Sequence, residues 1–140
     1  MGLSYLLDTN ILSEPVKPKA DIRVLQRLEK HAGMYVTAST VWHELLYGVE
    51  RMPNSKRKDH LSSYLDSLEV SGLNVLAYDK EAAAWLAGQR ALLSQRGIAT
   101  SMTDGEIAAV AYTNNLVLVT RNVKDFSMFE GLHIENWFEA

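Results

Sequence analysis

Four acidic side chains stand where they could act on a common substrate. Asp8 follows the apolar run YLL, Glu44 lies within TVWHELLYGVE, Asp104 precedes the run IAAVA, and Asp125 follows LVTRNVK. Carboxylates brought together repel one another, which raises their pKa values unless a cation neutralises them. Because the chain has no cysteine and its 4 histidines show no metal-ligand spacing, oxygen ligands would select a hard ion such as Mg²⁺ or Mn²⁺. Such an ion can activate water against a phosphodiester.

Each of these acids also has an ordinary explanation. Asp8 could form an Asx turn or cap a short helix. An exposed helix glutamate is commoner than a functional one, which applies to Glu44. Asp104 falls in a predicted first helical turn, where the helix dipole favours a negative charge. Asp125 could be a loop or cap residue, so only the combination points to a site.

The predicted elements that would position these acids alternate between strands and helices. Apolar runs predict strands at 3–7, 34–37, 73–78, 116–119 and 132–137. Periodicity and end signals predict helices at about 21–33, 39–52, 55–69, 79–96 and 104–114, whereas the proline-containing segment 13–21 cannot be regular helix. This order predicts one α/β domain with a mainly parallel sheet and helices on both faces.

Three local patterns make more specific predictions about the helices. Ile22, Leu25 and Leu28 recur on one face of the first helix. Ser39 or Thr40 can cap the second helix. The tetrapeptide at 103–106, TDGE, has the form of a capping box, so a helix should begin close to Asp104.

The strand ends explain why the acids should meet. In open α/β sheets, ligands bind outside the carboxyl ends of the strands, at the point where the strand order reverses. Asp8 falls at one such end, and the TRN segment from Thr120 to Asn122 falls at another.

The bulk composition narrows the function classes. Without cysteine there is no disulfide framework, thiolate zinc site or cysteine nucleophile. No signal-peptide pattern or long apolar span is present, so we expect a soluble cytoplasmic protein without a membrane segment. A net charge of −3 argues against bulk electrostatic coating of nucleic acid, but a nuclease needs only local basic contacts.

Five segments, taken in order, resemble the PIN-domain ribonucleases, and most closely the VapC-type toxins of bacterial toxin–antitoxin modules. They are LLDTNILSE at 6–14, HELLYGVE at 43–50, WLAGQRALLSQRG at 85–97, TDGEIAAVA at 103–111 and LVTRNVKDF at 118–126. Each motif is short, but the five together span nearly the whole chain. The resemblance implies a PIN-like three-layer α/β/α sandwich, formed by one nuclease domain over residues 1–140.

The resemblance also implies roles for single residues. Asp8 and Asp104 match the metal-binding aspartates of the family and are expected to contact Mg²⁺ or Mn²⁺ directly. Glu44 matches the helix glutamate, which is expected to position a metal-bound water or a second ion. Thr120 is expected to hydrogen-bond within the same site.

The chain departs from the family at a fourth acid, which often follows the Thr-Arg pair directly. Asn122 stands at that position, and the nearest acid is Asp125. Asn122 could bind an ion weakly or hold a metal-bound water, while Asp125 could supply the missing charge from the next turn. Both alternatives remain open from the sequence.

The activity that the resemblance implies is an Mg²⁺- or Mn²⁺-dependent endoribonuclease, the toxin of a toxin–antitoxin pair, which cuts RNA with metal-activated water. It also implies a homodimer and a VapB-type antitoxin. The C-terminal segment of the antitoxin would cover the active-site groove, often with a basic side chain that reaches the acids.

Two other functions remain open. A PIN fold that has lost catalysis could serve only as a binding module, which Asn122 leaves possible. A receiver-type phospho-acceptor domain also gathers acids at strand ends. It would need an acidic pair where this chain has Asp8 followed by Thr9, and an acceptor aspartate where Asp79 opens a predicted helix.

Overall fold

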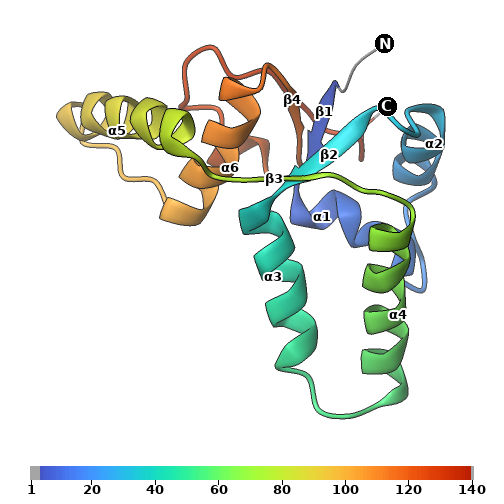
Figure 1. The fold of residues 1–140 in the computed structure, drawn as a ribbon. Coiled ribbons are helices and arrows are strands. Elements are labelled where there is room, and N and C mark those ends of the chain that lie inside the picture. Colours follow the sequence, from blue (N-terminus) through green and yellow to red (C-terminus); the bar gives the residue numbers. More distant parts are fainter. Residues whose placement is uncertain (1–3, 140) are drawn as a thin grey trace.

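A parallel sheet of short strands runs through the middle of the protein (Figure 1). The computed structural model describes residues 4–139, so position 3 of the first predicted strand lies outside the described residues. Within them the sheet has five strands in the order β3-β2-β1-β4-β5, and every pairing is parallel. The strands are β1 Tyr5–Leu7, β2 Tyr35–Ala38, β3 Val75–Leu76, β4 Val117–Val119 and β5 Ile134–Glu135.

Helices cover the sheet from both sides, which confirms the predicted α/β/α architecture. Figure 1 shows α5 and α6 on one side of the sheet and α2 on the other, while α3 and α4 form a hairpin that extends beyond the sheet. The α-helices are α1 Thr9–Leu12, α2 Ile22–Lys30, α3 Ser39–Glu50, α4 Lys56–Val70, α5 Lys80–Gln95 and α6 Met102–Thr113. Short 3₁₀ turns, η1 Glu14–Val16 and η2 Val123–Asp125, follow α1 and β4.

The strand order reverses between β1 and β4. The chain passes from β1 outward to β2 and β3, and then returns to the other side of β1 for β4 and β5. Leu7 is in register with Val119, so the two central strands end side by side. The residues that follow them, Asp8 and Thr120, therefore lie at the reversal point, where α/β sheets place their ligands.

The central strands are held by burial on both faces. Leu6 and Leu7 in β1, like Leu118 and Val119 in β4, are each 0% exposed. Consecutive buried residues are what a parallel strand needs when helices cover both sides of its sheet. β1 and β4 thus belong to the most deeply buried part of the fold.

The expected apolar face of α2 is confirmed for Leu28 and wrong for Ile22. Ile22 is 62% exposed, whereas Val24 is fully buried and Leu28 packs against the core. Asp21 caps the helix by accepting a hydrogen bond from the Arg23 backbone N–H. This start places Ile22 at the first helical position, and the helix packs through residues spaced by four instead.

The expected caps of α3 and α6 were also wrong. Ala38 precedes α3 without a side-chain cap, and Ser101, rather than Thr103, caps α6 by accepting from the Asp104 backbone N–H at 3.1 Å. The reason is a contact between the two helices. Thr40 Oγ1 donates to Glu106 Oε1 at 2.8 Å, so both side chains are engaged across the helix pair rather than in local caps.

The remaining helices follow the prediction closely, whereas β3 and β5 are shorter than predicted. The segment 13–21 contains no α-helix, α4 begins after its Ser55 cap, and α5 begins after its Asp79 cap. Among residues 4–139, no helix combines the length and the apolar character needed to cross a membrane.

Candidate functional site

Asp8 is held rigidly at the end of β1. Its side chain is 6% exposed and caps α1, because Oδ1 accepts a hydrogen bond of 2.7 Å from the Thr9 backbone N–H. The other oxygen, Oδ2, accepts from Thr120 Oγ1 at 2.8 Å and from Asn10 Nδ2 at 3.5 Å. The capping explanation is therefore correct, yet the same carboxylate also faces β4.

Thr120 connects Asp8 to the turn that follows β4. It is fully buried, and its Oγ1 accepts a hydrogen bond of 3.0 Å from the Asn122 backbone N–H while donating to Asp8. A second link joins the same two segments, because the Arg121 backbone N–H donates to Asn10 Oδ1 at 3.1 Å. These bonds place Asn122 beside Asp8 despite the distance between them in sequence.

Glu44 reaches the site from α3. Its Oε1 accepts a hydrogen bond of 3.3 Å from Thr9 Oγ1, the residue that follows Asp8. Partial burial raises the pKa of Glu44, and the nearby charges of Asp8 and Asp104 raise it further. The side chain of Glu44 is thus electrostatically coupled to both aspartates.

Asp104 approaches from the first turn of α6. Partial burial raises its pKa, and the charge of Asp125 adds to that rise. The charge of Asp104 in turn contributes to the raised pKa of Asp8, for which burial is the largest cause. The end of β1, the middle of α3 and the first turn of α6 therefore bring three mutually repelling carboxylates to one edge of the sheet.

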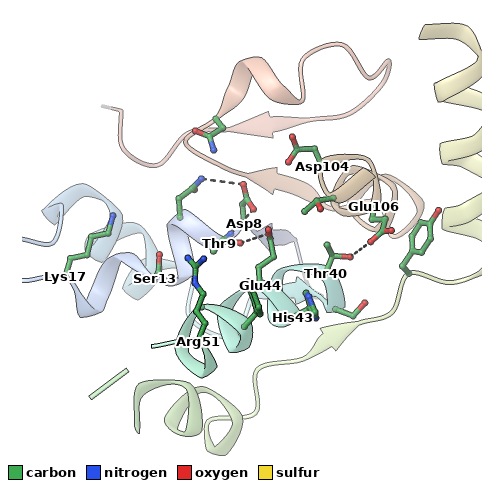
Figure 2. A pocket seen from close by; sticks show the side chains of 17 residues that line it. Asp8, Thr9, Ser13, Lys17, Thr40, His43, Glu44, Arg51, Asp104 and Glu106 are labelled. Carbon is green, nitrogen blue, oxygen red and sulfur yellow. Dashed lines mark hydrogen bonds between the residues drawn. The ribbon is translucent and has the colours of Figure 1, made fainter. Parts of the chain in front are cut away.

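These acids line a pocket of about 1070 Å³ at the carboxyl ends of the strands. Asn122 and Glu106 belong to its lining, as do the cations Lys17 and Arg51. Figure 2 shows Lys17 and Arg51 on one side of Asp8 and Glu44, and the hydrogen-bonded pair Thr40 and Glu106 on the other. The pocket thus has an acidic centre and one cationic side.

The structure distinguishes between the two candidates for a fourth group. Asn122 lines the pocket, whereas Asp125 is exposed, lies outside the lining and acts through its charge on Asp104. In residues 4–139, no three histidine, cysteine, aspartate or glutamate side chains are close enough to enclose a metal ion by themselves. The acids surround the pocket rather than converge on one point.

Sequence reasoning missed the cations and Glu106. Lys17 is held by an ion pair of 3.2 Å from its Nζ to Oε1 of the buried Glu14. The segment that carries Lys17 is irregular and has no predicted periodicity, so the sequence offers no signal that would place Lys17 at the pocket. Glu106 was interpreted as a cap, and only the fold brings it to Thr40.

Comparisons with known proteins agree with this architecture. The PIN domain family model matches residues 5–130. The chain is 33% identical over 135 residues to ribonuclease VapC2 of Haemophilus influenzae, with 96% of this chain and 98% of that protein covered. It is 32% identical over 136 residues to the tRNA(fMet)-specific endonuclease VapC of Shigella flexneri, with the same coverage.

A solved structure shares the fold over the full length. VapBC2 from Rickettsia felis, crystallised with a DNA fragment from its promoter, contains a chain that superposes with a TM-score of 0.81 at 32% identity. The match covers 98% of this chain and 99% of that one. The protein therefore belongs to the PIN-domain family, among its VapC-type members.

Proposed function

We propose that the protein is an endoribonuclease that hydrolyses RNA phosphodiesters and acts as the toxin of a toxin–antitoxin pair. The observation that carries the proposal is the gathering of Asp8, Glu44 and Asp104 around one pocket at the ends of β1 and β4. Their mutual repulsion destabilises the fold, so a structural role does not account for it. The relatives named for ribonuclease and tRNA endonuclease activity support RNA as the substrate class.

The proposed cofactor is Mg²⁺ or Mn²⁺, held by Asp8 and Asp104. The donor set fits such an ion, since the three central groups are carboxylates. Their spread around the pocket also fits, because Mg²⁺ commonly takes one or two carboxylates and fills its remaining positions with waters and substrate phosphates. When bound, a divalent ion supplies a Lewis acid for the phosphate and lowers the pKa of water.

The side chains of the site have separable roles in this proposal. Thr120 and the start of α1 hold the Asp8 carboxylate in one orientation. Glu44, with its raised pKa and the hydrogen bond from Thr9, is suited to orient water and accept its proton. The Asn122 amide faces the substrate, while Asp125 tunes the charge of Asp104 from outside the pocket.

The proposed partner is a VapB-type antitoxin. A largely apolar groove of about 410 Å³ adjoins the pocket between α3 and α4, with Leu45, Val49, Leu61 and Leu65 in its lining. An antitoxin segment lying in this groove would reach the acids across Gly48 and Arg51, which line both cavities. The VapBC2 pair of R. felis supports such a complex, and we expect a homodimeric toxin that acts in the cytoplasm.

Antitoxin-free protein incubated with a mixed-sequence RNA tests the activity. We expect internal cleavage that requires Mg²⁺ or Mn²⁺ and is lost in Asp104→Asn, while Asp66→Asn, on the exposed surface of α4, remains active. Sequencing of the RNA ends would locate the cut. Absence of cleavage in the wild type, or equal cleavage by Asp104→Asn, would refute the proposal.

The same experiment addresses the two rival functions. A binding module without catalysis predicts that the wild type and Asp104→Asn behave alike. A receiver-type domain predicts a phospho-acceptor aspartate after β3, but Asp79 accepts the capping hydrogen bond of α5 from the Ala82 backbone N–H at 2.9 Å. Asp79 also lies outside the pocket lining, which favours the hydrolase.

A further inference from the structure

The exposed side of α3 carries three side chains spaced by one helical turn along the pocket. His43, Tyr47 and Arg51, here called the α3 ridge, all belong to the pocket lining. Residues four apart lie on one face of a helix, so these three side chains form one line along the helix that carries Glu44. His43 and Arg51 are labelled in Figure 2, on the helix that also carries Glu44.

Tyr47 is the centre of this ridge and is not a core residue. Its side chain is 58% exposed, an unusual position for a large aromatic ring. The Arg51 guanidinium lies over the ring at 5.4 Å from its centroid. The His43 and Tyr47 rings are parallel to within 1°, with centroids 6.3 Å apart. The two rings therefore present parallel aromatic faces beside the pocket.

Gly48 supplies an independent observation on the same helix. A glycine in the middle of a helix costs about 0.5–1 kcal/mol relative to alanine. Nothing in the described chain lies within 4 Å of a Cβ added at Gly48, so close internal packing does not explain it. The residue lines the pocket and the adjoining groove, where a missing side chain leaves room for a ligand.

We propose that the α3 ridge binds a single-stranded segment of the RNA substrate beside the scissile phosphate. An unpaired base packs against the exposed aromatic surface formed by His43 and Tyr47, Arg51 contacts a neighbouring phosphate, and the sugar-phosphate backbone passes over Gly48. The inference rests on the proposed nuclease function and names the conformation of RNA that the site accepts. Tyr47 is three residues beyond Glu44, a rise of about 4.5 Å along the helix, so the base belongs to a nucleotide next to the cut.

The charges of the ridge suit RNA. Arg51 and Lys17 lie on the same side of the acids in Figure 2, and both line the pocket. Cations there attract the phosphates on either side of the cleaved bond and hold the strand against three carboxylates. Aromatic stacking combined with basic side chains is the usual means of binding single strands without a fixed sequence.

A fluorescein-labelled mixed-sequence 12-mer RNA tests the inference by anisotropy, in an Asp104→Asn background with Mg²⁺ to prevent cleavage. Tyr47→Leu should weaken binding about tenfold, whereas Tyr47→Phe, which keeps the ring, should stay near the parent. Leu46→Ala is the matched control, because Leu46 is exposed on the same helix but lies outside the pocket lining. Arg51→Gln should reduce the steepness with which the logarithm of the RNA affinity falls against the logarithm of the salt concentration, by about 0.7.

The Gly48→Ala variant distinguishes an effect on RNA contact from an effect on folding. The melting temperature should rise by about 2–4 °C, because alanine favours the helix, while RNA affinity falls. Gly88→Ala is the control, since Gly88 lies within α5, has equally open space and lines none of the described pockets. Its melting temperature should rise without loss of RNA affinity.

The outcomes distinguish this inference from the function on which it rests. A wild type that neither binds nor cleaves RNA overturns both. A wild type that cleaves RNA, with Tyr47→Leu and Gly48→Ala equal to it in affinity and KM, overturns only the ridge. Variants that keep RNA affinity and weaken antitoxin binding overturn it as well, since the ridge would then be a protein contact.

Discussion

Thr120 Oγ1 donates a 2.8 Å hydrogen bond to Asp8 Oδ2, joining two side chains that are 112 residues apart in the chain. Both side chains are buried, and the strands that deliver them end in register. A hydrogen bond to the ionised carboxylate opposes the pKa rise that burial causes. Thr120 therefore keeps Asp8 ionised at a lower pH than burial alone would allow.

Thr120→Val should shift the acid limb of RNA cleavage to higher pH. Valine keeps the shape of threonine but removes the hydrogen-bond donor. The pKa of Asp8 therefore rises further, and its carboxylate ionises only at a higher pH. The measurement is the cleavage rate from about pH 4 to 9. Thr120→Ser, which retains a hydroxyl, should have the pH profile of the wild type. A Thr120→Val profile that superposes on that of the wild type would contradict the role of Thr120 in lowering the pKa of Asp8.

Asp104→Asn should raise the melting temperature at neutral pH in the absence of divalent ions. The folded-state pKa of Asp104 lies above its ordinary value of 3.8, so its stabilising contribution is complete below that pH. The contribution is lost as the pH rises through the folded-state pKa. Asparagine resembles the protonated form, and thermal melts should therefore differ at pH 7.5 and coincide near pH 3.

The same variant should respond less to metal. Mg²⁺ or Mn²⁺ relieves the repulsion among the acids only where a carboxylate is present, so the wild type should gain more thermal stability from either ion. Equal gains in the two proteins would place the ion elsewhere.

Asn122→Asp should strengthen divalent-ion binding, measured by calorimetry with Mn²⁺. The side chain already lines the pocket, and a carboxylate there adds a charged ligand beside Asp8 and Asp104. Asp125→Asn should have a much smaller effect, because Asp125 is exposed and lies outside the lining. If Asp125→Asn lowered the affinity for Mn²⁺ by more than Asn122→Asp raised it, Asp125 rather than position 122 would be the fourth group of the site.

Gly105→Ala should destabilise the fold by about 1–3 kcal/mol through overpacking. A Cβ at Gly105 would lie 2.8 Å from Leu86 Cδ1, and Leu86 is only 1% exposed, so it has little room to move. Denaturant unfolding measures the change. The Gly88→Ala protein gives the reference, since there the same substitution meets open space.

The parallel strands could be predicted because their buried positions are consecutive apolar residues in the sequence. Leu6 and Leu7, or Leu118 and Val119, have no polar alternation, which is typical of a strand covered on both faces. The position of Asp8 and Thr120 at strand ends followed from that order, whereas the pairing of β1 with β4 is known only from the structure. Strand lengths were overestimated, as at β3, because apolar residues continue past the paired segment.

The details that escaped prediction depend on contacts between distant segments. Ser101 and Thr103 offer the same local chemistry for a cap, and the bond from Thr40 to Glu106 accompanies the choice of Ser101. Asn122 and Asp125 are three residues apart, and the 3₁₀ turn η2 decides which of them lines the pocket. No periodicity in the sequence encodes such a turn.

The reversal of strand order also has a consequence for synthesis on the ribosome. β1 precedes the other strands in the chain, yet it is the middle strand of the sheet, and its pairing is complete only once β4 has been made. A nascent chain that has not yet exposed residue 104 carries Asp8 and Glu44 without the third acid, and one shorter than residue 120 lacks the hydrogen bond from Thr120 to Asp8. The pocket with its three acids is therefore assembled only after both halves of the sheet have been made.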